Sequence, residues 1–104
     1  MSAINLKLQL INRGEEGELL MIGRLDSSTS DEAEDIMLKL VDRFDIITLN
    51  MSELKYISSS GLRILKKMYM KTVKEGKDLQ VKKASPFVFE TFQMTGFAGI
   101  LKII

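Results

Sequence analysis

The sequence predicts an α/β fold, a mixed β-sheet with helices packed on it, in the element order β-β-α-β-α-β-α-β. The first observation behind this prediction is that short apolar or alternating segments, typical of strands, are separated by segments with helical spacing of apolar residues. The second is that the first two strand segments follow each other directly, whereas each later one comes after a helical segment. Such alternation favours a largely parallel sheet with helices packed on it.

The first two strand segments are joined by a predicted hairpin turn. Residues 4–10 alternate apolar and polar side chains, which is the pattern of a half-buried strand. Residues 12–18 are polar and contain two glycines, so they are expected to form the turn. Residues 19–25 are mostly apolar and predict a second strand that is more deeply buried than the first.

A helix and a third strand are predicted next. The segment from residue 26 to residue 44 opens with serines and acids, so a serine or an aspartate is expected as the N-cap, and the acids suit the helix dipole. Residues 45–51 are short, β-branched and apolar, as in a buried strand. The apolar residues at helical spacing that define the inner face of the helix are Ala33, Met37, Leu40, Val41 and Phe44.

The second predicted helix begins near Ser59 and ends at Gly76, a plausible C′ residue. Met70 falls on the other side of this helix from its expected apolar face, so its side chain is predicted to be exposed. That expected inner face consists of Leu62, Leu65, Tyr69, Thr72 and Val73.

The remaining segments complete one domain that spans residues 1–104. Residues 78–84 alternate as a strand, and Ser85 with Pro86 predicts the start of a third helix. The segment 95–99 breaks that helix, and residues 100–104 predict a short last strand. The sequence contains neither internal repeats nor a low-complexity linker, which favours a single core.

Composition argues against several classes of protein. Lys and Arg total 15 and Asp and Glu total 14, giving a net charge of +1, so neither nucleic acid nor an anionic membrane surface is an expected partner. The chain has no Cys and no His, so neither disulfides nor zinc, haem or iron–sulfur sites are expected. No apolar run reaches membrane-spanning length and the N-terminus has no signal-peptide pattern, so we expect a cytoplasmic protein.

Three consecutive serines, Ser58, Ser59 and Ser60, raise the question of their purpose, because they stand directly before Gly61 at the start of the second helix. One serine is enough to cap a helix, and capping is the simplest reading. The alternative is a phosphorylation site, since an anion here would lie next to free N–H groups at a helix N-terminus. A catalytic serine is not expected, because the chain has no His base and no nucleophile-elbow motif.

Three segments of the chain resemble, in order, the motifs of the STAS domain family, in particular its stand-alone anti-sigma factor antagonists. Residues 23–30 (GRLDSSTS) resemble the family's G-x-[LI]-D followed by a helix. Residues 46–65 (IITLNMSELKYISSSGLRIL) resemble its strand, its D-[ST]-[ST]-G loop and the following helix. Residues 84–103 (ASPFVFETFQMTGFAGILKI) resemble its Ser-Pro helix and its ending.

The resemblance implies a regulatory protein rather than an enzyme. In that family, an anti-sigma factor that is also a serine kinase phosphorylates the residue after the acid of D-[ST]-[ST]-G, and that position is Ser59 here. Phosphorylation releases the antagonist from the kinase, and a serine phosphatase reverses it. Partner binding is thereby expected at the phosphorylation loop and the G-x-[LI]-D loop, namely at Asp26, Ser58, Ser60, Gly61 and Arg63.

The chain departs from the family pattern at two positions. Ser58 stands where the family has the acid before the phosphoserine, and Asn50 stands where it has an acid at the end of the preceding strand. The missing charge at Ser58 keeps a second hypothesis open, an interaction module that docks its partner without being phosphorylated. On either hypothesis we expect no cofactor, and a monomer or a weak dimer.

Two segments of the chain are rich in charged residues, one basic and one acidic. The second helix carries several basic residues, but no aromatic stacking set accompanies them, so a solvated face or a contact with an acidic patch on a protein is expected. The acids of residues 30–35 lack the spacing of a calcium loop and suit the N-terminus of the first predicted helix, where the helix dipole favours negative charge. The basic residues are Arg63, Lys66, Lys67, Lys71 and Lys74.

Overall fold

The computed structural model describes residues 5–104 and confirms the predicted element order, including the short last strand. The helices are α1 (Ser30–Arg43), α2 (Ser59–Glu75) and α3 (Pro86–Thr95), and the 3₁₀ turn η1 (Phe97–Gly99) follows α3. The strands are β1 (Leu6–Arg13), β2 (Glu16–Leu25), β3 (Ile46–Ile57), β4 (Asp78–Lys82) and β5 (Lys102–Ile103).

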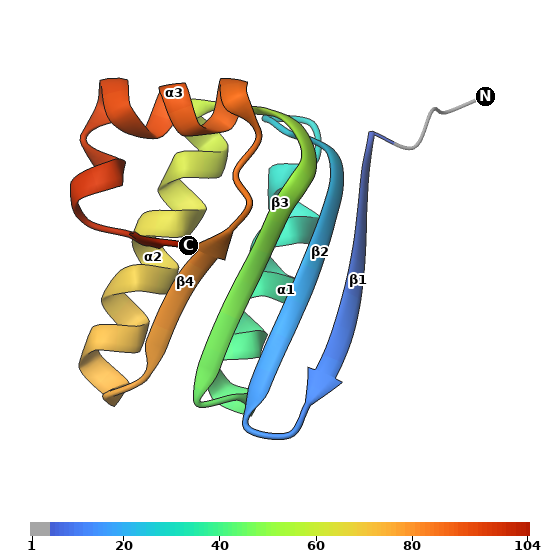
Figure 1. The fold of residues 1–104 in the computed structure, drawn as a ribbon. Helices are drawn as coiled ribbons and strands as arrows, with labels where there is room; N and C mark the ends of the chain where they lie inside the picture. The colour runs from blue at the N-terminus through green and yellow to red at the C-terminus, as the bar shows by residue number, and fades with distance from the viewer. Residues whose placement is uncertain (1–4) are drawn as a thin grey trace.

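The strands form one mixed sheet in the order β1-β2-β3-β4-β5, so strands that are adjacent in the sheet are also consecutive along the chain. β1 pairs with β2 in antiparallel orientation, and the other neighbouring strands are parallel (Figure 1). Each parallel connection contains a helix, as a crossover between parallel strands requires. The prediction of a mixed, largely parallel sheet is therefore confirmed.

The first hairpin is tighter than predicted. β1 continues to Arg13, and only Gly14 and Glu15 form the turn, instead of the whole segment 12–18. Gly14 has a φ of 81°, which a residue without a Cβ adopts at little cost. The predicted start of this strand at Ile4 lies outside the described residues.

β3 is longer than predicted. A strand end near Met51 was wrong, because β3 runs on to Ile57, directly before the serines. Two register irregularities against β2, between Leu20 and Ile22 and between Gly23 and Arg24, interrupt the simple alternation in the second half of β3. Strand pairing thus continues through a stretch whose polar side chains had suggested a loop.

The predicted inner face of α1 is confirmed, and its predicted cap is wrong. Ala33, Met37, Leu40, Val41 and Phe44 are all buried in the core, as the helical spacing had indicated. The N-cap is Thr29 rather than a serine or aspartate, and the Thr29 side chain makes no capping bond, because its oxygen accepts a 3.0 Å hydrogen bond from the Asp26 N–H while its hydroxyl donates to the Arg24 carbonyl oxygen.

The predicted inner face of α2 was rotated by about one residue. The exposed fraction of Val73 is 62%, and Tyr69 is also exposed, although both were expected inside. α2 packs on β4 and β3 and also against α1, so its buried stripe faces the corner between sheet and helix. The residues buried in it are Gly61, Ile64, Leu65, Met68 and Thr72. Met70 is 59% exposed and Gly76 is the left-handed C-terminal residue, both as predicted.

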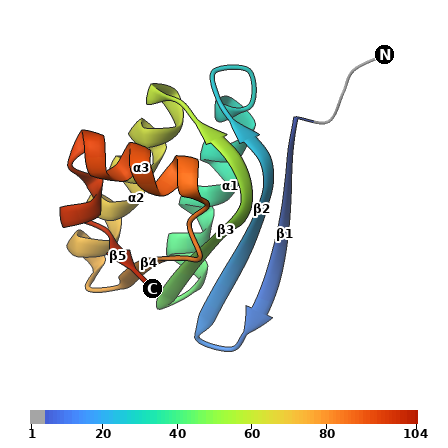
Figure 2. The same cartoon turned by 45° about the horizontal axis from the view of Figure 1, so that its top comes forward.

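α1 and α2 lie side by side on one face of the sheet, as Figures 1 and 2 both show. The core fills the space between these helices and the sheet. α3 crosses one end of the molecule and buries Val88 and Phe92 in the same core. Ser85 is the N-cap residue of α3, as predicted, but its hydroxyl makes no capping bond and instead donates a 2.6 Å hydrogen bond to the Leu54 carbonyl oxygen, which ties α3 to β3.

The other face of the sheet carries a polar network toward the starts of β2 and β3. Alternation along β2 places Glu16 and Glu18 on the face opposite α1, because Gly17 between them contacts the Phe44 ring of the α1 end. The Thr48 hydroxyl donates to Glu16 at 2.6 Å, and the Asn50 amide donates to Glu18 at 3.0 Å. Glu18 is buried, and Arg13 and Lys82 also lie within ion-pair distance of its carboxylate.

Candidate functional site

The two loops singled out in the sequence meet at the carboxyl ends of β2 and β3. The backbone N–H of Ser58 donates a 2.9 Å hydrogen bond to the carbonyl oxygen of Leu25, so the start of α2 is tied to the residue before Asp26. Functional loops of parallel sheets gather at this edge. The Asp26 loop therefore lies next to the serine run.

Ser58 is the N-cap of α2. Its backbone is extended, with φ −97° and ψ 178°, and its carbonyl oxygen accepts the first helical bond from Leu62 at 2.9 Å. The Ser58 hydroxyl oxygen accepts a long 3.4 Å hydrogen bond from the backbone N–H of Gly61. The capping role accounts for one serine and assigns it to position 58.

Ser59 is the first residue of α2, and its side chain is exposed. The N–H groups of a first helical turn have no partner inside the helix and carry the positive end of its dipole. Ser60 is half-buried, and Arg63 is exposed one turn further along the helix. Of the three serines, Ser59 is therefore the most accessible to another protein.

Gly61 is buried, and the surface that approaches its backbone belongs to the protein itself. A Cβ at this position would lie 2.7 Å from Cγ1 of Ile57 and 2.9 Å from Cγ of Leu25. The absence of a side chain at this position therefore brings α2 close to the strand ends. Gly61 thus determines where Ser59 stands.

Asp26 holds its own loop together. Its carboxylate accepts hydrogen bonds from the Ser28 hydroxyl at 2.7 Å and from the Ser28 backbone N–H at 3.0 Å, and Arg24 lies within 3.4 Å. The Ser28 hydroxyl has the largest effect and lowers the pKa of Asp26; burial opposes it, and the Ser28 backbone N–H and Arg24 add to the lowering. The carboxylate is therefore a fixed negative charge beside the serine loop.

A cation–aromatic cluster next to this loop was not found from the sequence. The Arg24 guanidinium lies 4.4 Å from the centre of the Tyr56 ring, and the Tyr56 ring lies 5.4 Å from that of Phe87. These residues come from β2, β3 and α3, so only the fold brings them together. Their spacing in the sequence gives no signal of this contact.

Comparison with known proteins identifies the family of this chain. The family model described as "Mlab, STAS domain" matches residues 9–103, which is nearly the whole chain. The chain belongs to the STAS domain family. The resemblance of the three sequence motifs is thus confirmed.

Solved structures of anti-sigma factor antagonists share the fold of this STAS domain. One from Mycobacterium paratuberculosis superposes with a TM-score of 0.86 at 21% identity and covers 99% of this chain and 89% of that one. Unphosphorylated SpoIIAA gives 0.77 at 18% identity, covering 95% and 87%. The phosphorylated form of SpoIIAA from Bacillus gives 0.71 at 17% identity, covering 95% and 90%. At these identities the likeness concerns the fold.

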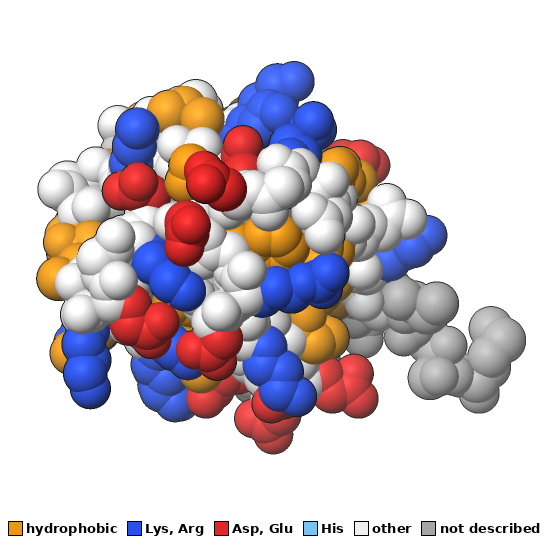
Figure 3. All heavy atoms as spheres, turned by 90° about the horizontal axis from the view of Figure 1, so that it is seen from below, with side chains coloured by type: hydrophobic (Ala, Val, Ile, Leu, Met, Phe, Trp, Pro, Cys, Tyr) orange, Lys and Arg blue, Asp and Glu red, His pale blue; other side chains and the backbone are white. Residues whose placement is uncertain are grey.

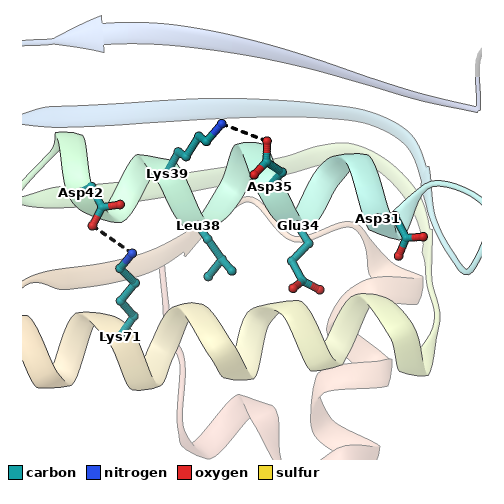
Figure 4. A pocket seen from close by; sticks show the side chains of 7 residues that line it. All are labelled: Asp31, Glu34, Asp35, Leu38, Lys39, Asp42 and Lys71. Atoms are coloured by element: carbon teal, nitrogen blue, oxygen red, sulfur yellow. Dashed lines mark hydrogen bonds and ion pairs between the residues drawn. The ribbon is translucent and has the colours of Figure 1, made fainter.

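The basic residues of α2 in this STAS domain are partly neutralised by α1. Lys67 lies 2.9 Å from Glu34, and Lys71 lies 2.9 Å from Asp42. A shallow groove of about 340 Å³ lies along these helices. Figure 4 shows that most of its lining side chains are acids of α1, together with Lys39 and Lys71, which form ion pairs with them. At the end of the molecule viewed in Figure 3, acidic and basic side chains are also interspersed. This charge pattern is that of solvated helix faces.

Two further properties concern the described part of the STAS domain. Within residues 5–104, no three acidic side chains are arranged to hold a metal ion, and the acids of residues 30–35 are no exception. None of the helices in that range is long and apolar enough to span a membrane. The acidic side chains Asp31 and Glu32 instead occupy the first turn of α1, where the helix dipole favours them.

Proposed function

We propose that this STAS domain is an anti-sigma factor antagonist in a partner-switching circuit. In its unphosphorylated form it binds an anti-sigma factor that is also a serine kinase. Phosphorylation at Ser59 releases it, and a serine phosphatase restores the binding form. The observation that carries the proposal is the exposed Ser59 side chain at the first position of α2.

The position of Ser59 suits a reversible change of charge. A phosphate adds about −1.5 to −2 charges and three acceptor oxygens. Next to the free N–H groups of the first turn of α2, its charge is stabilised by about 0.3–1 kcal/mol through the helix dipole. The modification therefore alters the surface that a partner reads while the fold beneath it persists.

The proposed contact surface consists of the two joined loops and the first turns of α2. Asp26 in the neighbouring loop and Arg63 one turn further along α2 provide charges of opposite sign, and Ser60 is half-buried. Ser58 and Gly61 act from below, because one caps the helix and the other lets it approach the sheet. A doubly negative group at Ser59 adds to the Asp26 charge and changes the electrostatic match with a partner.

The proposal assigns the chemistry of phosphate transfer to the partner. The chain has no glycine-rich phosphate loop with a lysine and no histidine, so ATP binding and catalysis belong to the kinase. The antagonist supplies the acceptor hydroxyl and the docking surface. A cytoplasmic location follows from the same proposal, since sigma factors act on transcription there.

The test uses the purified protein, its cognate kinase and ATP. We expect the wild type to take up one phosphate and Ser59→Ala to take up none, measured by intact-protein mass spectrometry. Ser60→Ala is the matched control, because it removes the neighbouring hydroxyl and leaves Ser59 in place. Equal phosphorylation of wild type and Ser59→Ala would show that Ser59 is the wrong residue.

The second measurement concerns release. Binding of the kinase to wild type, to Ser59→Ala and to Ser59→Asp is compared by isothermal titration calorimetry. The switch predicts that Ser59→Ala binds as the wild type does and that Ser59→Asp binds at least tenfold more weakly. An aspartate variant that binds as tightly as the wild type would count against the switch.

One observation favours a second candidate function, a STAS module that docks its partner without phosphorylation. Ser58 occupies the position of the family acid, so a charge that a kinase of that type would meet is absent. Ser58→Asp restores that charge at the N-cap, where aspartate is also a good capping residue. If neither wild type nor Ser58→Asp is phosphorylated while the partner still binds, the module is the better description.

A further inference from the structure

β1 is an edge strand with unusually little protection. Its pairing with β2 is continuous from Leu6 to Arg13, without a bulge, and the strand contains no proline. Edges of this length are usually blunted by charges, prolines or bulges, and β1 has only Lys7 and Arg13. The opposite edge of the sheet, β5, is only two residues long. The two edges therefore differ in their capacity to receive another strand.

The backbone groups on the outer side of β1 can be identified from the hairpin. The two-residue turn closes on the pair Arg13 and Glu16, and the Arg24 N–H donates to the Asn5 carbonyl oxygen at 2.7 Å. Hydrogen-bonded pairs alternate along an antiparallel ladder, so the odd-numbered residues of β1 point their backbone groups at β2. The even-numbered residues point theirs outward: Leu6, Leu8, Leu10 and Asn12.

The same even-numbered residues carry apolar side chains on the helix side of the sheet. Leu6 and Leu8 are only partly buried, and Leu10 is 38% exposed. Ile36, which is 45% exposed, lies on the flank of α1 opposite the flank that faces α2. The helix side of the β1 edge thus carries partly exposed leucines, and Ile36 is an exposed apolar residue on the outer flank of α1.

We propose that β1 is a self-association surface, which pairs antiparallel with β1 of a second copy around a two-fold axis at Gln9. In this register Leu8 pairs with Leu10 of the other copy, and Leu6 with Asn12, so every outward-pointing backbone group meets its equivalent. The leucines of both copies then lie side by side on the helix side of the joined sheet. The interface is isologous and closes, as a two-fold dimer requires.

Charge selects this register over its neighbour. An axis at Leu10 would set Lys7 directly opposite Arg13 of the other copy, and like charges opposite each other destabilise a strand pair. An axis at Leu8 avoids that contact but pairs fewer residues of the strand. With the axis at Gln9, Lys7 faces Ile11, and the Arg13 charge is already compensated by Glu18 at 3.1 Å.

A single cysteine tests the register. The chain has no cysteine, so Gln9→Cys introduces the only thiol. At the axis the two Cα atoms lie about 4.5 Å apart, within the range of a disulfide. The matched control is Ile11→Cys on the same face, whose two copies lie about 14 Å apart in this register. Under mild oxidation we expect covalent dimers from Gln9→Cys and monomers from Ile11→Cys.

Charge exchange at the axis tests the association without covalent chemistry. Gln9→Lys and Gln9→Glu each place like charges opposite themselves, so each variant alone is expected to weaken dimerisation at least tenfold. An equimolar mixture is expected to restore a dimer of about twice 11.8 kDa, measured by sedimentation equilibrium. Circular dichroism of each variant monitors folding, and the exposed position of Gln9 leaves the core untouched.

Three results would overturn the proposal. The first is a wild type that sediments as a monomer up to several hundred micromolar. The second is cross-linking of Ile11→Cys in place of Gln9→Cys, which indicates another register. The third is a dimer that Gln9→Lys leaves unchanged, which places the interface elsewhere. Since none of these measurements involves Ser59 or a kinase, they are independent of the proposed switch.

Discussion

Replacing Gly61 by alanine tests whether close helix–sheet packing positions the Ser59 loop. The added methyl group would lie 2.7 Å from Cγ1 of Ile57, 2.9 Å from Cγ of Leu25 and 3.0 Å from the Leu25 carbonyl oxygen. All three atoms belong to the buried ends of β2 and β3, so α2 has to move outward. Overpacking of this kind costs about 1–3 kcal/mol, and the higher helix propensity of alanine returns up to about 1 kcal/mol.

We therefore expect Gly61→Ala to lower the free energy of unfolding by about 1–2 kcal/mol. The Tm should fall by about 5–15 °C for a domain of this size. Urea unfolding followed by circular dichroism measures the first quantity, and a thermal melt the second. The slope of the urea transition should stay the same, because the surface exposed on unfolding hardly changes.

Gly99→Ala is the matched control, because a Cβ at Gly99 meets no atom within 4 Å and its backbone φ is not in the left-handed region. It should be neutral or stabilise by up to about 1 kcal/mol through the unfolded chain. Equal stability of Gly61→Ala and the wild type would refute the reasoning, since it would mean that α2 rests on the sheet more loosely than the distances indicate.

Two further predictions concern buried polar contacts. The Asn50 hydrogen bond, helped by Lys82 and Arg13, lowers the pKa of Glu18 despite its burial, so the ionised carboxylate stabilises the fold above pH 4.5 and that contribution disappears as the pH falls through the lowered pKa. Glu18→Gln should cost about 1–2 kcal/mol at pH 7 in urea unfolding, and this deficit should shrink as the pH falls below 4.5; a deficit that keeps its pH 7 size throughout the acid range would contradict the assignment. Ser58→Ala should cost about 0.5–1 kcal/mol through the lost cap, and Ser58→Asp should be at least as stable as the wild type, which calorimetric melts of both variants can decide.

Local signals predicted the fold well wherever one residue type decides the conformation. Gly76 ends α2 in the left-handed region, and Pro86 stands at the start of α3, as the sequence indicated. The buried face of α1 also followed from the helical spacing of its apolar residues. The element order and the largely parallel sheet followed from the alternation of strand and helix patterns along the chain.

Contacts that depend on tertiary packing could not be predicted. The buried face of α2 was misplaced because apolar residues occur on neighbouring faces of that helix, so that Ile64 and Met68 are buried while Val73 stays outside. The end of β3 was misplaced because irregular pairing lets a strand carry several exposed polar residues. The contact between Arg24 and Tyr56 joins residues 32 positions apart, and no local pattern encodes it.

The bond from the Ser58 N–H to the Leu25 carbonyl has a consequence for how such a site evolves. Both atoms belong to the main chain, so any residue except proline at position 58 can keep the anchor that fixes where Ser59 emerges. Side chains around the anchor are then free to drift and to acquire new recognition partners one at a time. Paralogues with this fold can therefore change their binding partners while the position of the Ser59 hydroxyl stays the same.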